Sequence, residues 1–203
     1  MIVAGAGGHA LELLDILISM ERTKNLEFFD ELSSIDVFQD RFPIIHSEEK
    51  VKAHFSKDPF FILGTGNPIV RHQFYKRFSD LGGKLITVKG KGVVFSDFTS
   101  GAEEADIFNL CFISAKTQLG KGCLINTGAQ IHHEVKIGEF TEISPGAVLL
   151  GKVEVGSFCS IGAHATILPK VRIGNHVTVG AGSVVTKDVP DGVTVIGVPG
   201  RIV

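Results

Sequence analysis

The sequence lacks the features of several classes of protein. It has no run of Lys and Arg, and its formal net charge is −2, which argues against a nucleic-acid-binding surface. No apolar stretch approaches the length of a membrane-spanning helix. Only three cysteines occur, and the first residues show neither a basic region nor a cleavage site. We therefore expect a soluble cytoplasmic protein with reduced thiols that binds no membrane and no nucleic acid.

A strict six-residue period fills the C-terminal half of the chain. Stepping by six from Ile113 to Val185 meets only Ile, Leu or Val, and a small or β-branched residue follows four positions later. Neither a helix (period 3.6) nor an ordinary strand (period 2) produces this spacing. Three hexads instead close a triangular coil whose aliphatic residues point inward and stack about 4.8 Å apart along the axis. We expect about five coils over residues 95–190, with all three cysteines in the core.

Residues 1–90 show a different pattern. Residues 2–4 are an apolar run followed by a glycine turn, and residues 10–20 have helical spacing. Two more apolar runs, at 26–29 and 60–63, precede a second helical stretch at 69–81 and a strand at 84–88. The alternation predicts a Rossmann-like βαβ unit. We place the domain boundary at 90/91, which leaves 91–203 for the β-helix and its C-terminal tail.

The glycine turn at residues 5–10 loosely fits the G-x-G-x-x-A dinucleotide fingerprint, and Asp30 lies near the expected distance downstream. About 90 residues hold only half of a dinucleotide fold, so a nucleoside diphosphate or nucleotide sugar fits better. Its phosphates would lie near the N–H groups at the helix start and its base or ribose near Asp30. A purely structural turn is the alternative.

Two adjacent histidines and a carboxylate, His132, His133 and Glu134, interrupt the polar outer positions of the repeat. A histidine takes up a proton near neutral pH, and a nearby carboxylate stabilises its charged form. Spacing does not separate His132 from His133 as the general base. We expect His164 and His176 to be exposed, and no metal site, because these histidines are not separated by multiples of 18 and do not stack.

Several segments carry a resemblance to a known family. They are the opening GAGGHA, FFDEL, GTGNPIVR, INTGAQIHHEVKIGEF, the unbroken hexads and the terminal GVPGRIV. Together they resemble the bacterial PglD/NeuD-type sugar acyltransferases. The resemblance implies a Rossmann-like α/β domain followed by a left-handed parallel β-helix. It also implies a homotrimer that needs no metal and transfers an acetyl group from acetyl-CoA to a nucleotide-linked amino sugar, such as a UDP-4-amino-sugar, for bacterial glycan biosynthesis.

The resemblance also implies roles for single residues. It makes His133 the catalytic base, with Glu134 tuning it and Asn126 near the acceptor sugar. The implied nucleotide-sugar contacts are Gly7, Gly8, His9, Asp30, Glu31, Gly66 and Ile69. The implied acetyl-CoA contacts are Glu142, Ala163 and Ala181, with the N–H of Gly151 facing the developing oxyanion. The sequence departs from the family at the acidic pair, Asp-Glu in place of Asp-Asp, and the resemblance gives His132 no role.

Three other functions fit parts of the sequence. O-acetylation of a sugar such as a sialic acid would use the same base on a hydroxyl. A γ-carbonic-anhydrase-like metal lyase on the same scaffold predicts bound zinc. A non-catalytic nucleotide-sugar sensor predicts binding without thiol release from acetyl-CoA. The sequence does not identify the sugar, the base or the acyl chain length.

Overall fold

The computed structural model describes all 203 residues, and the chain forms two compact units. The first unit comprises residues 1–66 and 70–87, and the second comprises 67–69 and 88–203. The first ladder contact of the second unit is the parallel bridge between Lys89 and Ile107, next to the boundary expected at 90/91. No helix in the structure is both long enough and apolar enough to cross a lipid bilayer.

The first unit is a six-stranded sheet in the order β3-β4-β2-β1-β5-β6, parallel except for the β3–β4 pair. The strands are β1 (Ile2–Ala4), β2 (Glu27–Phe29), β3 (Val37–Phe38), β4 (Phe42–Ile45), β5 (Phe60–Leu63) and β6 (Lys84–Leu85). The helices are α1 (Gly8–Ser19), α2 (Glu48–Phe55) and α3 (Pro68–Asp80). The Rossmann-like α/β fold is confirmed. The sequence pattern does not predict β3, β4 and α2, because residues 37–55 carry no long periodic run.

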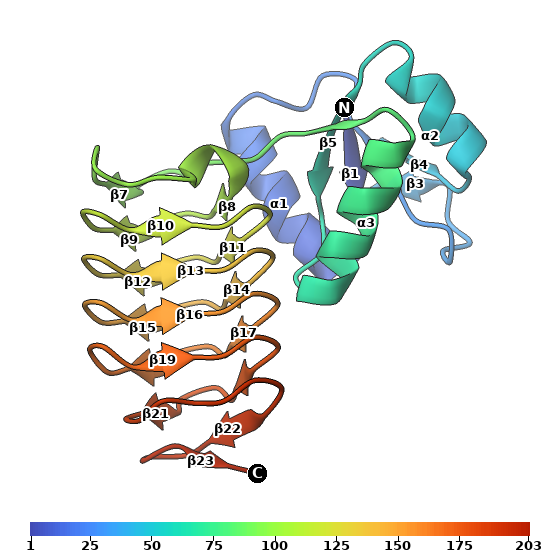
Figure 1. The fold of residues 1–203 in the computed structure, drawn as a ribbon. Helices are drawn as coiled ribbons and strands as arrows, with labels where there is room; N and C mark the ends of the chain where they lie inside the picture. Colours follow the sequence, from blue (N-terminus) through green and yellow to red (C-terminus); the bar gives the residue numbers. More distant parts are fainter. The chain divides into compact units, whose positions relative to one another are not determined.

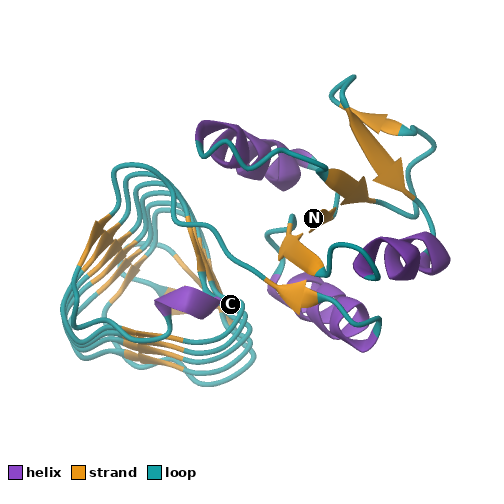
Figure 2. Ribbon diagram, turned by 90° about the horizontal axis from the view of Figure 1, so that it is seen from above, coloured by secondary structure: helices purple, strands orange, loops and turns teal.

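Helices cover both faces of this sheet, α1 on one side and α2 with α3 on the other (Figure 2). The buried ring of Phe78 from α3 contacts Phe55 of α2 at a centroid distance of 5.6 Å and Phe61 of β5 at 5.4 Å. The chain leaves β1 toward β2 but leaves β5 toward β6, so the direction of winding reverses between β1 and β5. In doubly wound sheets, ligands bind beyond the carboxyl ends of the two strands at such a point.

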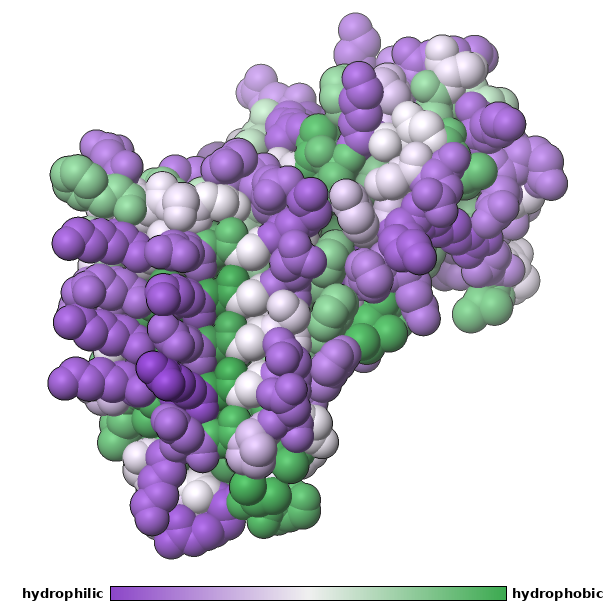
Figure 3. All heavy atoms as spheres, in the orientation of Figure 1, coloured by the Kyte–Doolittle hydropathy of each residue, from purple (hydrophilic) through white to green (hydrophobic).

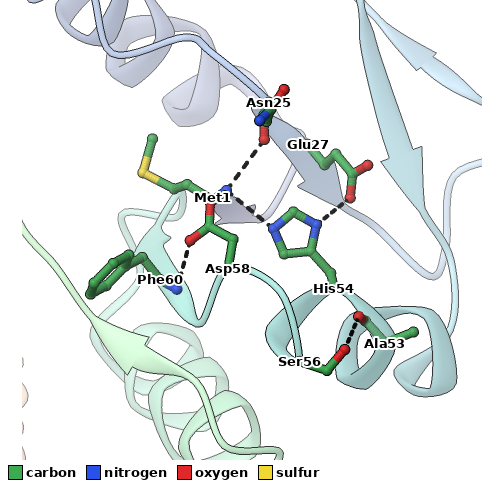
Figure 4. Close-up of polar contacts among 8 residues, drawn as sticks. All are labelled: Met1, Asn25, Glu27, Ala53, His54, Ser56, Asp58 and Phe60. Carbon is green, nitrogen blue, oxygen red and sulfur yellow. Dashed lines mark hydrogen bonds and ion pairs between the residues drawn. The ribbon is translucent and has the colours of Figure 1, made fainter.

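The amino ends of the strands are held by a polar cluster on the opposite edge (Figure 4). The Met1 ammonium contacts the Asp58 carboxylate, donates to the Asn25 carbonyl at 3.2 Å and lies 3.1 Å from Nε2 of His54. Nδ1 of His54 in turn lies 2.7 Å from Oε2 of Glu27 in β2. This cluster fixes the start of β1 at the end of the sheet opposite the carboxyl ends of the strands.

The second unit is a triangular β-helix whose coils stack with an 18-residue register (Figures 1 and 2). Three parallel sheets form its faces. The first face contains β8 (Asp106–Ile107), β11 (Leu124–Ile125), β14 (Glu142–Ile143), β17 (Ser160–Ile161), β20 (Thr178–Val179) and β22 (Thr194–Ile196), closed by antiparallel β23 (Arg201–Ile202). The second contains β7 (Val94–Phe95), β9 (Phe112–Ile113), β12 (Gln130–Ile131), β15 (Val148–Leu149), β18 (Thr166–Ile167) and β21 (Val184–Val185). The third contains β10 (Gln118–Leu119), β13 (Lys136–Ile137), β16 (Glu154–Val155) and β19 (Arg172–Ile173). A short 3₁₀ helix, Ala102–Glu104, lies in the first coil.

The core of the β-helix confirms the prediction that the aliphatic residues of the six-residue repeat point inward. The aliphatic positions from 113 to 185 are all buried, as are the three cysteines, which form no disulfide. Each thiol contacts a backbone carbonyl fifteen residues ahead, as Cys123 does with Gly138 at 2.9 Å. Burial raises the pKa of the Cys111 thiol to about 11. These cysteines are therefore inert core residues.

The second and third faces differ in chemistry. The outward residues of the third face include Lys136, Glu154 and Arg172, and Glu154 lies 3.0 Å from Nζ of Lys136 and 3.4 Å from Nε of Arg172. Figure 3 shows the resulting rows of hydrophilic side chains over β10, β13, β16 and β19. The outward residues of the second face carry no charge: Val94, Phe112, Gln130, Val148, Thr166 and Val184. The third face is suited to water and the second is not.

Candidate functional site

A cavity of about 340 Å³ lies at the carboxyl ends of β1 and β5, where the sheet reverses its winding. Five of the predicted nucleotide contacts line it: Gly7, Gly8, His9, Asp30 and Glu31. The other two, Gly66 and Ile69, do not belong to its lining. The cavity is also lined by four residues that the sequence motifs do not predict as contacts: Phe29, Thr65, Val70 and Phe74. Phe29, Thr65 and Val70 each adjoin a residue that was predicted as a contact, whereas Phe74 lies within α3 and carries no such signal.

The glycines around this cavity have two distinct roles. A Cβ on Gly64 would lie 2.5 Å from the Val3 side chain, and one on Gly5, where φ is +117°, would lie 3.0 Å from the Gly64 carbonyl oxygen. These two glycines allow β1 and β5 to approach each other. A Cβ on Gly7 or Gly8 would meet nothing within 4 Å. The absence of side chains there keeps space open at the start of α1, whose first N–H groups have no side-chain cap.

The two acidic residues of the cavity make different contacts. Oδ1 of Asp30 accepts the N–H groups of Leu32 at 2.9 Å and Ser33 at 3.1 Å, so it shapes its own loop. Glu31 instead receives a bidentate pair from Arg77 of α3, at 2.8 and 2.7 Å. This hydrogen-bonded pair lowers the pKa of Glu31. The Glu31 carboxylate is therefore engaged within the protein, whereas Asp30 retains one oxygen beside the cavity.

A buried arginine lies against the turn that follows β5. Arg71 of α3 is 0% exposed, and its guanidinium donates to the carbonyls of Leu63 at 3.2 Å and Thr65 at 2.8 Å. Burial, together with the charge of Arg71, lowers the pKa of His9 to about 4. His9 is consequently neutral at physiological pH.

In the β-helix, His133 and Glu134 lie in the turn that joins the second face to the third. Nδ1 of His133 is 3.3 Å from Oε1 of Glu134, and 57% of the His133 side chain is exposed. Glu134 has φ +61°, a left-handed conformation shared by the residues at its position in successive coils, Lys116, Lys152 and Lys170. The turn therefore places the carboxylate beside the imidazole while leaving the ring open to solvent. The neighbouring His132 is half-buried, and its ring packs edge-on against Phe112.

Glu134 lies between two lysines, Lys116 and Lys152, which occupy the equivalent position of the turn one coil before it and one coil after it. Nζ of Lys152 is 3.6 Å from Oε2 of Glu134. Partial removal from water raises the pKa of Glu134, but the hydrogen bond with His133 and the charges of Lys152 and Lys116 outweigh it and lower that pKa. The carboxylate therefore remains ionised in the range in which an imidazole titrates.

The residue one coil beyond His133 is Gly151, and the imidazole lies directly against it. A Cβ on Gly151 would be 2.4 Å from Nε2 of His133. The Gly151 carbonyl accepts the Lys170 N–H, but the Gly151 N–H donates no hydrogen bond within the chain. Nε2 of His133 and the unused N–H of Gly151 thus lie in adjacent stacked turns of the β-helix.

Asn126 and Glu142 lie together in the coils of the first face. Nδ2 of Asn126 donates to Oε1 of Glu142 at 2.7 Å, and the Ser144 hydroxyl donates to the same oxygen at 2.8 Å. Asn126 is 5% exposed, and its Oδ1 has no hydrogen-bond partner within the chain. The structure thus pairs a residue expected to contact the acceptor sugar with one expected to contact acetyl-CoA.

Ala163 and Ala181 occupy equivalent positions in successive coils, at the turn that joins the first face to the second. The Ala163 carbonyl accepts the Gly182 N–H, which links the two turns. No group of three or more His, Cys, Asp or Glu side chains lies close enough together within the chain to hold a metal ion. His164 and His176 are exposed as expected, and His176 stacks on Phe158 at 5.0 Å.

Each of the two units matches a known protein family. Residues 1–78 match the PglD N-terminal domain family, and residues 116–151 and 152–187 match the bacterial transferase hexapeptide family. The structure is similar to the acetyltransferase domain of PglB from Neisseria gonorrhoeae (28% identity, TM-score 0.89), covering 100% of this chain and 98% of that one. The same domain in complex with acetyl coenzyme A matches with a TM-score of 0.78.

A second similar structure is PerB from Caulobacter crescentus in complex with CoA and GDP-perosamine. It is 26% identical with a TM-score of 0.90, and the match covers 100% of this chain and 96% of that one. The N-terminal family, the hexapeptide repeats and these full-length matches agree with the order of the two units along the chain. The chain belongs to the family of bacterial PglD/NeuD-type sugar acyltransferases.

Proposed function

We propose that this protein is a nucleotide-amino-sugar N-acetyltransferase that takes its acetyl group from acetyl-CoA. The observation that carries the proposal is the turn in which an exposed imidazole lies beside a carboxylate and against a glycine with an unused N–H. A general base and an oxyanion donor are the two groups that acyl transfer to an amine requires.

His133 is the proposed general base. The side of the ring carrying Nδ1 faces Glu134, so Nδ1 carries the proton and donates to the carboxylate, and Nε2 is the basic nitrogen. The sugar amine attacks the thioester carbonyl carbon, and Nε2 takes the proton that the amine loses. The Gly151 N–H donates to the oxygen that becomes negative. When the tetrahedral intermediate collapses, the C–S bond breaks and the CoA thiolate takes the proton from His133.

The nucleotide part of the substrate is assigned to the cavity of the first unit. The open space at Gly7 and Gly8 and the uncapped start of α1 suit a diphosphate. Asp30 is placed to accept a hydrogen bond from the ribose or base, whereas Glu31 acts through Arg77. The family resemblance favours UDP, and the PerB complex contains GDP-perosamine.

The acetyl-CoA contacts remain those implied by the resemblance: Glu142, Gly151, Ala163 and Ala181. In addition, the Glu142 carboxylate holds the side chain of Asn126, the residue assigned to the acceptor sugar, through the hydrogen bond from Nδ2 of Asn126. We also propose a cytoplasmic homotrimer, with Gly66 and Ile69 as further nucleotide contacts.

Thiol release from acetyl-CoA, measured against UDP-, GDP- and dTDP-linked 4-amino sugars, tests the proposal. We expect release and an acetylated product with one of the three, and a loss of at least about a hundredfold in kcat for His133→Ala. His176→Ala is the matched control because it removes an exposed turn histidine elsewhere in the β-helix. Full activity of His133→Ala would overturn the mechanism. Activity with hydroxy sugars alone would assign the protein to O-acetylation.

A further inference from the structure

Arg71 is the only arginine of the chain that is fully buried, and it lies behind the proposed nucleotide cavity. Transfer of a charged side chain out of water costs several kcal/mol, so a fully buried guanidinium needs compensating interactions. Its guanidinium donates hydrogen bonds to the carbonyls of Leu63 and Thr65, on either side of Gly64. Gly64, Thr65 and the adjacent Val70 line the cavity.

We propose that Arg71 is the residue that makes the cavity selective for a diphosphate, by orienting the turn after β5 and by placing a buried positive charge behind it. Arg71 is a positioning residue, because it acts through the backbone and through its field. The inference rests on the proposed nucleotide-sugar function and adds to it the group that recognises the phosphates.

The orienting effect follows from the geometry of the peptide bond. In a trans peptide the carbonyl and the next N–H point in opposite directions. Because the Thr65 carbonyl points to Arg71, the N–H of Gly66 points away from the guanidinium. That N–H donates no hydrogen bond within the chain, and the Gly66 backbone lies close to His9. Arg71 therefore fixes the direction of a backbone donor that is next to Thr65 and His9, which line the cavity, although Gly66 itself does not.

The charge effect is visible at His9. Burial and the charge of Arg71 keep that imidazole neutral, so the positive potential at this end of the cavity comes from Arg71 and the N–H groups of α1. The other charged groups at the cavity are Asp30 and Glu31, and Arg77 neutralises Glu31. The cavity is thus positive at the glycine turns and negative near Asp30, which suits a phosphate at one end and a hydroxyl or N–H donor at the other.

The test compares diphosphate and nucleoside binding in folded variants. UDP, GDP and dTDP are titrated into the wild type by calorimetry, and the one that binds is compared with its parent nucleoside in Arg71→Met and Arg71→Lys. We expect Arg71→Met to weaken diphosphate binding by about tenfold or more and to leave nucleoside binding within about twofold. Arg71→Lys, which keeps the charge, should recover part of the loss. Arg41→Met, an exposed arginine of the same unit that lies over the Phe42 ring, is the control.

A spectroscopic measurement separates the charge effect from a merely structural one. Titration of the His9 ring by NMR should show a higher pKa in Arg71→Met than in the wild type. If Arg71→Met does not fold, Arg71→Gln, which retains amide donors for the carbonyls, replaces it. Equal losses for nucleoside and diphosphate, or an unchanged diphosphate affinity, would overturn the inference while leaving the proposed function intact. A wild type that binds none of the three diphosphates would overturn the nucleotide site itself.

Discussion

The imidazole of His133 occupies the space that a side chain on Gly151 would need. This contact distinguishes His133 from the adjacent His132. His132 packs against Phe112, whereas His133 is exposed beside Glu134. Because stacking brings together residues 18 apart, Gly151 was identifiable from the sequence as the neighbour of His133. The orientation of the His133 ring was not identifiable from the sequence, since a repeat fixes where a residue lies but not its rotamer.

Gly151→Ala should slow acetyl transfer without unfolding the protein. The new Cβ would lie 2.4 Å from Nε2 of His133, so the ring must move away from its position beside Glu134. We expect kcat to fall by at least about tenfold with a change in Tm of only a few degrees. Steady-state kinetics and thermal melting measure the two effects. Unchanged kcat would show that the ring position does not matter for transfer.

His9 should make the stability of the protein depend on pH. Its pKa is lowered to about 4 in the folded protein, from an ordinary value of 6.5. Between these values the unfolded chain binds a proton that the folded chain does not, so stability falls as the pH drops from 6.5 to 4. The full effect, reached only below pH 4, is of the order of 3 kcal/mol, and about 2 kcal/mol of it is expected at pH 5. Chemical denaturation at pH 7.5 and pH 5 measures it, and His9→Asn should show a smaller loss at pH 5. Identical losses in both proteins would contradict the assignment.

At the scale of single elements, the coil of the β-helix is the unit that packs. Each two-residue strand directs one side chain outward and one into the core, and the inner ones stack on equivalents one coil away. In the first unit, by contrast, the strands form one sheet, and helices pack against its two faces. The hexad period predicted the first arrangement directly, whereas β3, β4 and α2 escaped detection because propensity over short segments is weak.

Ile143→Ala should destabilise the β-helix. Ile143 is 0% exposed, and its truncation leaves a cavity that the stacked neighbours in adjacent coils cannot fill. We expect a loss of about 2–5 kcal/mol in the free energy of unfolding. Gln118→Ala, on an exposed outward position of the third face, should change it by less than about 0.5 kcal/mol. Denaturant titration of both variants tests this, and equal effects would contradict the inward assignment.

At the scale of the whole molecule, the difference between the faces of the β-helix bears on assembly. The third face carries stacked ion pairs, whereas the outward residues of the second face are uncharged and partly apolar. An uncharged face of this kind is suited to burial against another copy of the chain. The proposed homotrimer would bury it and leave the third face in water.

Val148→Lys should therefore disrupt assembly. It places a charge in the middle of the second face, where burial would be costly. We expect light scattering to give three times the 21.8 kDa chain mass for the wild type and a smaller mass for the variant. Lys136→Glu, on the third face, should leave the mass unchanged. A monomeric wild type would rule out the trimer.

The sequence by itself determined the β-helix, its inward residues, the α/β unit and the family. The reason is physical: a strict period maps directly onto stacked coils, and short glycine motifs form local turns. Only the tertiary structure decided the contacts of Glu31, Arg77 and Arg71. Glu31 is held by an arginine 46 residues away, and Arg71 is buried beneath a turn. The α/β unit has no period that relates sequence distance to spatial distance, so these partners became visible only once the sheet and helices were packed.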